Sequence, residues 1–285
     1  MAGDRARGRA RDRARDRARD RARDRARDRE RILAFTRWLE ETTSTRVRPW
    51  RFGTALFHER FPRRWDSNFL RVERSVGSST SADLAAQADR ILSAFGHREF
   101  VFEDDEEGAR LAAGFVELGY TADRLVDLVL RRDPDREPPP IEVREVPLGT
   151  VRPLMIETNL VSHGGMDRGS AEMLADFATV FVARVGARFF GAWIDGELAG
   201  CCELYVHDGV AQIENVDTLE RFRNRGVARA FLAAATDAAR DAGADLVFLM
   251  ADDADWPKQL YAKLGFDPVG HFRQFRKPPP GETYR

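Results

Sequence analysis

The stretch Val216–Ala239, VDTLERFRNRGVARAFLAAATDAA, decides the fold of this chain. It predicts the end of a strand, a short polar loop and a long helix with one apolar face. A glycine permits close backbone approach, and the first turn of a helix offers unpaired N–H groups to an anion. Two arginines beside these donors favour a phosphate or pyrophosphate ligand. The residues of this R-x-x-G-x-A loop are Arg223, Asn224, Arg225, Gly226, Val227 and Ala228.

A second motif, LYAKLGF, follows at Leu260–Phe266. Together the two motifs resemble the signatures of the GNAT superfamily of N-acyltransferases, Q/R-x-x-G-x-G/A and L-Y-x-K-L-G-F. The resemblance covers roughly residues 141–277. It implies an α+β (α/β/α) fold, in which a mixed, mostly antiparallel and twisted sheet is flanked by helices. It also implies acetyl-CoA or a similar acyl-CoA as co-substrate, and no metal.

The resemblance assigns roles to particular residues. The pyrophosphate would bind the Arg223–Ala228 loop, and the hydroxyl of Tyr261 would protonate the departing CoA thiolate, since a phenol has a pKa near ~10. The alternative is that Tyr261 is a core residue packed beside Leu264 and Phe266. The family often has an asparagine seven residues before the tyrosine, where this chain has Ala254. The pantetheine arm would pair, like an added edge strand, with the backbone of Val216, Asp217 and Thr218.

The general base is less clearly marked. Glu214 and Glu203 lie on two predicted central strands, from which a carboxylate can face the acceptor. Asp217 and His207 are weaker candidates, and water can also accept the proton. His163, in a glycine-rich loop, could contact the acceptor.

Composition bounds the class of protein. A chain of 285 residues is long enough for two domains, and its net charge of −1 gives no attraction toward nucleic acid or acidic lipid. The adjacent Cys201 and Cys202 would point to opposite faces of a strand, so we expect neither a disulfide nor a metal site. This pattern fits a reducing compartment. No apolar run of ~18 residues occurs, so we expect a soluble cytoplasmic protein without a membrane partner.

The N-terminal segment 1–29 repeats R-A-R-D with a period of four residues. It lacks an apolar face, which predicts a solvated charged helix or a disordered tail whose removal leaves activity unchanged. The alternative is an arm that binds nucleic acid, with strong salt dependence.

An internal echo precedes the second motif. The segment ARLAAGFVELGY, which ends at Tyr120, aligns with PKQLYAKLGF, which ends at Phe266, and a predicted strand follows each. We therefore interpret residues 30–132 as a smaller, degenerate GNAT-like domain, with Phe115 at the position of Tyr261 and no phosphate loop. We expect this domain to act as a scaffold and to close one side of the acceptor cleft. The alternative is an unrelated α+β domain. A Pro-rich linker (133–140), the catalytic domain (141–276) and a tail (277–285) follow.

Within residues 30–132, apolar residues at helical spacing, among them Ile32, Phe35 and Leu39, predict a short helix at 30–41. Further helices are expected at 84–95 and 109–118, and strands at 99–102 and 125–130.

The second domain shows the element order that the resemblance implies. The Asp-Gly pairs at 195–196 and 208–209 predict two β-hairpins. Strands are expected at 141–146, 188–194, 198–206, 210–218, 246–250 and 268–276, and helices at 148–160, 169–185, 227–239 and 255–264.

The predicted function is direct transfer, within a ternary complex, of an acetyl or short acyl group from CoA to a primary amine. The alternative is a non-catalytic acyl-CoA sensor or interaction module, which turnover of any amine would exclude. Neither the acceptor nor the oligomeric state follows from the sequence.

Overall fold

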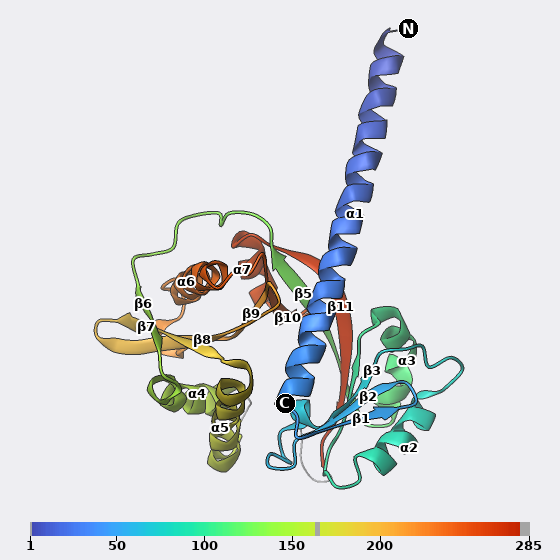
Figure 1. The fold of residues 1–285 in the computed structure, drawn as a ribbon, viewed down its shortest axis with the longest axis vertical. Coiled ribbons are helices and arrows are strands. Elements are labelled where there is room, and N and C mark those ends of the chain that lie inside the picture. The colour runs from blue at the N-terminus through green and yellow to red at the C-terminus, as the bar shows by residue number, and fades with distance from the viewer. Residues whose placement is uncertain (1, 163–165, 280–285) are drawn as a thin grey trace.

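A computed structural model describes residues 2–162 and 166–279, including the side chains of 19–161 and 166–279. Within these ranges the strands form one eleven-stranded sheet in the order β1-β2-β3-β4-β11-β5-β10-β9-β8-β7-β6. Helix α6 covers one face of its C-terminal half, and α4 and α5 cover the other (Figure 1). The sheet is mixed and mostly antiparallel, as predicted.

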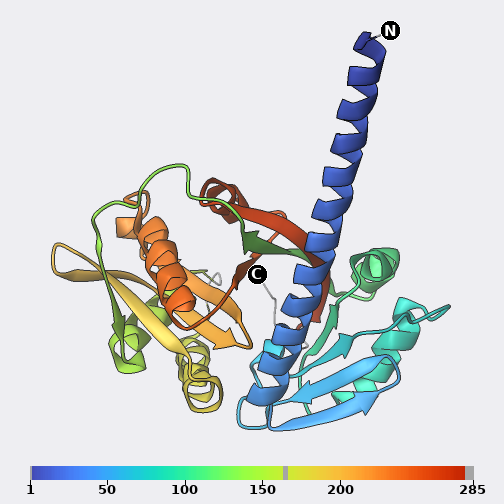
Figure 2. The ribbon, with the colours of Figure 1, turned by 45° about the horizontal axis from the view of Figure 1, so that its top comes forward.

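The N-terminal helix α1 (Ala2–Thr43) is longer than expected. The sequence predicted a short helix at 30–41 after a separate tail, whereas a single 42-residue helix spans both. Its first half extends away from the body of the molecule, and its second half crosses in front of β5 and β11 (Figures 1 and 2). Ile32, Phe35 and Leu39 are buried there against Tyr205 and Phe248. Their spacing places them on one helical face, which anchors α1 to the sheet.

The docked part of α1 begins before the predicted boundary at residue 29. The guanidinium group of Arg29 donates to the carbonyl oxygens of Glu103 and His271 (2.8 Å to His271) and lies 3.6 Å from the Asp127 carboxylate. Arg31 pairs with Asp245. Arg29 therefore belongs to the body of the protein. The sequence of the repeat does not reveal where the docked part begins, because the docked and the solvated residues are of the same types.

Deleting residues 2–26 is expected to change the melting temperature by less than about 2 °C, since side chains 19–27 are exposed and contribute little to packing. Deleting residues 2–29 also removes Asp28, which pairs with Arg131, and Arg29. Loss of these part-buried pairs should lower the melting temperature by several degrees more, about 2–4 °C per kcal/mol for a chain of this size. Thermal denaturation of both variants checks this. Equal melting temperatures would mean that Asp28 and Arg29 do not anchor the helix.

The first unit folds into a small sheet with two helices. The sequence predicted α2, α3, β4 and β5 close to their observed positions, but not the strands of 46–72 individually. Phe115 lies in its core, stacked on Phe275 at 4.5 Å. The elements are β1 (Arg46–Trp50), β2 (Gly53–Phe57), η1 (Trp65–Ser67), β3 (Phe69–Val72), α2 (Ser81–Ile91), β4 (Arg98–Phe102), α3 (Asp105–Glu117) and β5 (Thr121–Leu130).

The second unit follows the predicted order throughout. Asp195 and Gly196 both have positive φ (53° and 82°), as do Asp208 and Gly209 (47° and 72°), which fits the primed turns of tight hairpins. The elements are β6 (Glu142–Val146), α4 (Leu148–Ser162), α5 (Arg168–Val185), β7 (Arg188–Ile194), β8 (Glu197–His207), β9 (Val210–Thr218), η2 (Glu220–Phe222), α6 (Val227–Asp241), β10 (Leu246–Asp252), α7 (Pro257–Lys263) and β11 (Phe266–Lys277).

The two units repeat one topology and exchange a strand. In the first, β4 runs parallel to β3 and is followed by α3 and β5; in the second, β10 runs parallel to β9 and is followed by α7 and β11. Strand β11 inserts between β4 and β5, and β5 inserts between β11 and β10. The echo between the two glycine-aromatic segments is thus matched by the topology. The units are not separate bodies joined at the linker, because they share one sheet.

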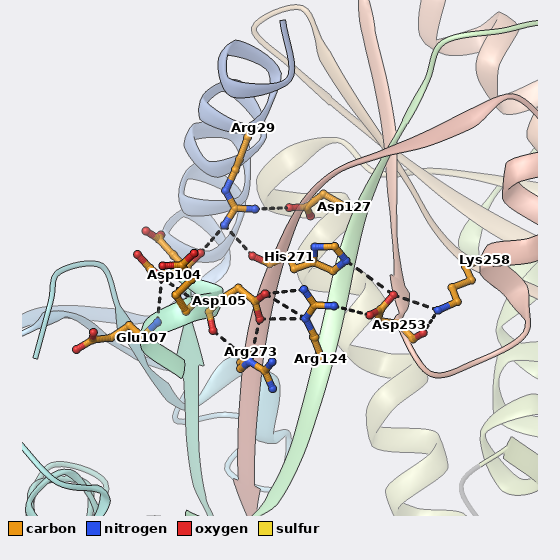
Figure 3. A network of polar contacts seen from close by, with 12 residues as sticks. Arg29, Asp104, Asp105, Glu107, Arg124, Asp127, Asp253, Lys258, His271 and Arg273 are labelled. Atoms are coloured by element: carbon orange, nitrogen blue, oxygen red, sulfur yellow. Dashed lines mark hydrogen bonds and ion pairs between the residues drawn. The ribbon is translucent and has the colours of Figure 1, made fainter. Parts of the chain in front are cut away.

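A charged network fixes this crossing (Figure 3). Arg124 of β5 and Arg273 of β11 face each other in the register, and both bind the Asp105 carboxylate at the start of α3. Arg124 also binds Asp253, 2.7 Å away in the loop before α7, and Asp253 pairs with Lys258. The starts of the two equivalent helices are therefore tied to the central strand pair.

Two further features were addressed by the sequence. Cys201 and Cys202 on β8 are buried and unpaired. Among the described helices, none is long and apolar enough to cross a membrane.

Candidate functional site

The candidate site lies where β9 and β10 separate. The two strands pair in parallel only from Val210 with Leu246 to Gln212 with Phe248, after which β10 continues beside β5. Strand β9 carries a bulge, because Asn215 (φ 50°) and Val216 together oppose Cys202 of β8. The bulge turns the end of β9 away from β10. In the described structure, the edge of β9 at Val216, Asp217 and Thr218 has no pairing with β10.

The R-x-x-G-x-A loop follows directly. Arg223, Asn224 and Arg225 are exposed, and Gly226 and Val227 begin α6. Gly226 has φ 88° and Asn224 has φ 61°, so the loop needs the left-handed conformations that glycine and asparagine adopt most readily. No side chain caps α6. The first N–H groups of α6 therefore have no side-chain acceptor at the N-cap, as an anion site requires.

The Pro-rich linker packs against this loop. A Cβ atom on Gly226 would lie 2.6 Å from Cγ of Pro139, so contact with the linker is a second reason for glycine there. Arg229, in the first turn of α6, is buried and pairs with Asp135 at 2.7 Å. The backbone N–H of Asp135 donates to the carbonyl oxygen of Lys263 at the end of α7. The linker thus borders the loop, and Arg229 already has an anionic partner.

Tyr261 lies on α7, which packs against β10 and β11. Tyr261 is partly buried against the core of the second unit and meets Phe266 edge to face at 6.3 Å. Burial, together with the nearby carboxylates of Glu214 and Asp217, raises the pKa of Tyr261 well above its usual range. Its hydroxyl group makes no hydrogen bond with another described residue.

Glu214 and Glu203 face each other across β9 and β8 but differ in surroundings. Glu214 is half-buried, lines a cavity and accepts a hydrogen bond from Nε2 of Gln212 at 2.6 Å. Burial raises the pKa of Glu214 to about 7. Glu203 is fully buried, outside the cavity lining, and accepts hydrogen bonds from Tyr205 and Asn215. Its position suits support of the bulge rather than contact with a substrate.

The other predicted residues are placed as follows. Asp217 accepts a hydrogen bond from Oγ1 of Thr158, and burial raises its pKa to about 6. His207 stacks on Trp38 at 3.8 Å, away from the separation. His163 lies outside the described residues. Asp253, next to Ala254, forms ion pairs with Arg124 and Lys258 in the network of Figure 3.

The cavity that Glu214 lines has a volume of about 350 Å³ and lies between the two units under α1. Glu214 and Asn215 of β9 and Ala251 and Asp252 of β10 all line it, so it borders both strands where they diverge. The sequence predicted that the first unit closes one side of the acceptor cleft. It did not identify the residues that do so, because nothing local marks them.

Comparisons with known proteins identify the fold. Residues 161–266 match the model of the acetyltransferase (GNAT) family, so the second unit carries a GNAT domain. A functionally unknown conserved protein from Staphylococcus epidermidis aligns with 83% of this chain and 94% of its own, with 15% identity and a TM-score of 0.66. A GCN5-related N-acetyltransferase from Kribbella flavida aligns with 89% of this chain and 96% of its own, with 20% identity and a TM-score of 0.58.

These similarities span both units, so the whole two-unit fold recurs in solved structures. Proteins of the GNAT family use acetyl-CoA as acyl donor. No curated protein matches the chain. Among the described residues, no group of three or more His, Cys, Asp or Glu side chains is placed to hold a metal ion.

Proposed function

We propose that the protein transfers an acetyl or short acyl group from CoA to a primary amine. The observation that carries this is the divergence of β9 and β10 beside an uncapped helix start, with Tyr261 and Glu214 near the gap. The exposed Arg223 and Arg225 would bind the pyrophosphate together with the N–H groups of Gly226, Val227 and Ala228. The free edge of β9 at 216–218 would hold the pantetheine arm.

The chemistry then needs one base and one acid. The neutral amine attacks the thioester carbonyl, a C–N bond forms, and the C–S bond breaks. Glu214 accepts the proton that leaves the nitrogen, and Tyr261 gives a proton to the thiolate, so the balance is an amide and a thiol. Burial raises the pKa of Cys201 and Cys202 far above the usual range, so both remain neutral thiols. This favours direct transfer over an acylated cysteine.

Calorimetric titration of acetyl-CoA into the full chain, without acceptor, is the first test. We expect one site per chain, because the first unit lacks the loop. Release of free thiol with an amine present would then exclude the alternative, a non-catalytic acyl-CoA sensor. Two sites per chain, or none, would contradict the assignment of the loop.

Replacing Arg225 by glutamate is expected to weaken acetyl-CoA binding by about 10-fold or more, as loss of a charge-assisted phosphate contact implies. In the structure, Nη2 of Arg225 lies 3.3 Å from Oδ2 of Asp195. The Asp195 side chain is exposed, so breaking this ion pair costs little stability. Arg240→Glu, at the other end of α6, makes the same charge change away from the loop and should leave the affinity within about twofold. Equal affinities of the two variants would remove Arg225 from the donor site.

A further inference from the structure

We propose that the acceptor is a linear polyamine, bound in the cavity between the two units with one cationic nitrogen beside Glu99 and another beside Glu214. This inference rests on the proposed function and adds the class of acceptor. It comes from the polarity of one face of the sheet, from two buried oxygen atoms without partners, and from the shape of the cavity.

One face of the central sheet is polar where the cavity lies. Glu99 and Val101 of β4, and Glu103 directly after it, line the cavity. Phe100 and Phe102 between them are buried in the core of the first unit. The lining contains seven carboxylates and three arginines, so formal negative charge is in excess. The carboxylates are Glu40, Asp66, Glu99, Glu103, Asp127, Glu214 and Asp252.

The three arginines of the lining are already occupied. Arg71 is buried and pairs with Glu40 at 2.6 Å, and Arg64 pairs with Asp66 at 3.0 Å. Arg276 lies 3.5 Å from Glu99 and 3.3 Å from Asp123. By contrast, neither Glu214 nor Asp252 forms an ion pair with any described residue. The carboxylates of the cavity that lack an ion-pair partner among the described residues therefore lie on β9 and β10, and they leave this side of the cavity with a net negative charge.

Two buried side chains in the lining each have an oxygen atom without a hydrogen-bond partner. Glu99 is fully buried; its Oε1 accepts a hydrogen bond from Gln274 at 2.6 Å, but Oε2 has no partner. Gln212 is 2% exposed, and its Oε1 has no partner. A buried acceptor without a donor is costly and rare in native structures. Both oxygens would be satisfied by a ligand that carries several N–H donors.

The carboxylates of the two units influence one another. Burial is the main cause that raises the pKa of Glu99 and of Glu214. The Asp66 carboxylate of the first unit adds to both pKa shifts, against the opposite effects of Arg276 on Glu99 and of Arg64 on Glu214, so these three acids lie within electrostatic reach of one another. Like charges held together favour a cation between them. Two of the acids come from the unit without a donor loop and one from the GNAT domain, so a ligand with separated positive charges would bridge the units.

The cavity is also elongated. It follows α1 from Ile32 to Thr43, which at the rise of an α-helix is about 16 Å. Phe177, Phe181 and Tyr205 add apolar walls, against which methylene groups can pack. A chain of methylenes with amines at intervals matches these walls and charges. The terminal nitrogen beside Glu214 binds as an ammonium group and releases one proton to water. The neutral amine then attacks the thioester, and Glu214 accepts the proton that leaves the nitrogen as the amide forms, as in the proposed function.

Calorimetric titration of the full chain with spermidine, in the absence of CoA, tests this inference. We expect one spermidine per chain, bound at least about tenfold more tightly than n-butylamine, which has one cationic nitrogen. Glu99→Gln should weaken spermidine binding by about tenfold or more. Glu142→Gln, an exposed site at the far edge of the sheet, makes the same charge change and should have no effect.

Equal affinity for spermidine and n-butylamine would overturn the inference, as would unchanged spermidine binding by Glu99→Gln. Should that variant not fold, the comparison of the two ligands on the unmodified chain decides alone. Acetyl-CoA is titrated into the same preparation. Acetyl-CoA binding without spermidine binding would refute the polyamine and leave the proposed function intact, whereas failure of acetyl-CoA to bind would refute the proposed function.

Discussion

Tyr261→Phe is expected to lower kcat by about 100-fold or more while acetyl-CoA binds with unchanged affinity. The reason is that a positioned general acid contributes about 10²–10⁴-fold to a proton transfer. The substitution keeps the ring and its edge-to-face contact with Phe266, so the packing of α7 is preserved. The hydroxyl group, which makes no hydrogen bond with another described residue, is the only group removed.

The measurement is steady-state release of free thiol, paired with calorimetry for acetyl-CoA. Tyr205→Phe is a matched control, because it keeps the ring that lines the cavity and removes only a hydroxyl group that donates to Glu203. We expect that variant to lose stability more than turnover. Full activity of Tyr261→Phe would show that the tyrosine only packs.

Glu214→Gln should remove the limb of the pH profile of kcat/KM that rises through about pH 7. The sign follows from the role: as a base, Glu214 must be ionised, and burial raises its pKa to about 7. Activity is therefore low below pH 6, rises through pH 7 and levels off above it. Glutamine cannot accept the proton, so the expected loss is about 100-fold or more near pH 8.

Asp217→Asn distinguishes the neighbouring candidate. Burial raises the pKa of Asp217 to about 6, so a base at this position would give a limb about one unit lower. If Asp217→Asn abolishes the limb and Glu214→Gln does not, Asp217 is the base. A limb that survives in both variants would assign proton removal to water.

The parts of the fold that the sequence predicted are those with local signals. The Asp-Gly turns, the glycine at the start of α6 and the apolar run of β10 each act within a few residues. The same holds for the candidate site, since the loop and Tyr261 stand in short motifs. The stripe of Ile32, Phe35 and Leu39 was also visible, but not the continuity of α1 with the charged repeat.

What could not be predicted depends on residues far apart in the chain. The pairing of β5 with β11 joins segments more than a hundred residues apart, and no local pattern sets such a register. The cavity has the same origin, because Glu99 and Gln212 come together only through the shared sheet. In the sequence each is one polar residue on a strand, which is the usual appearance of a solvent-facing position.

The exchange of β5 and β11 gives the first unit a structural role, which is to support a strand of the second unit. Strand β10, one wall of the candidate site, pairs with β9 for only three residues and is held along its other edge by β5. Without the first unit, β10 would be an unprotected edge at the place where the donor must be held. The first unit, which lacks a phosphate loop and the equivalent tyrosine, thus holds β10 in place for the second unit, which has both.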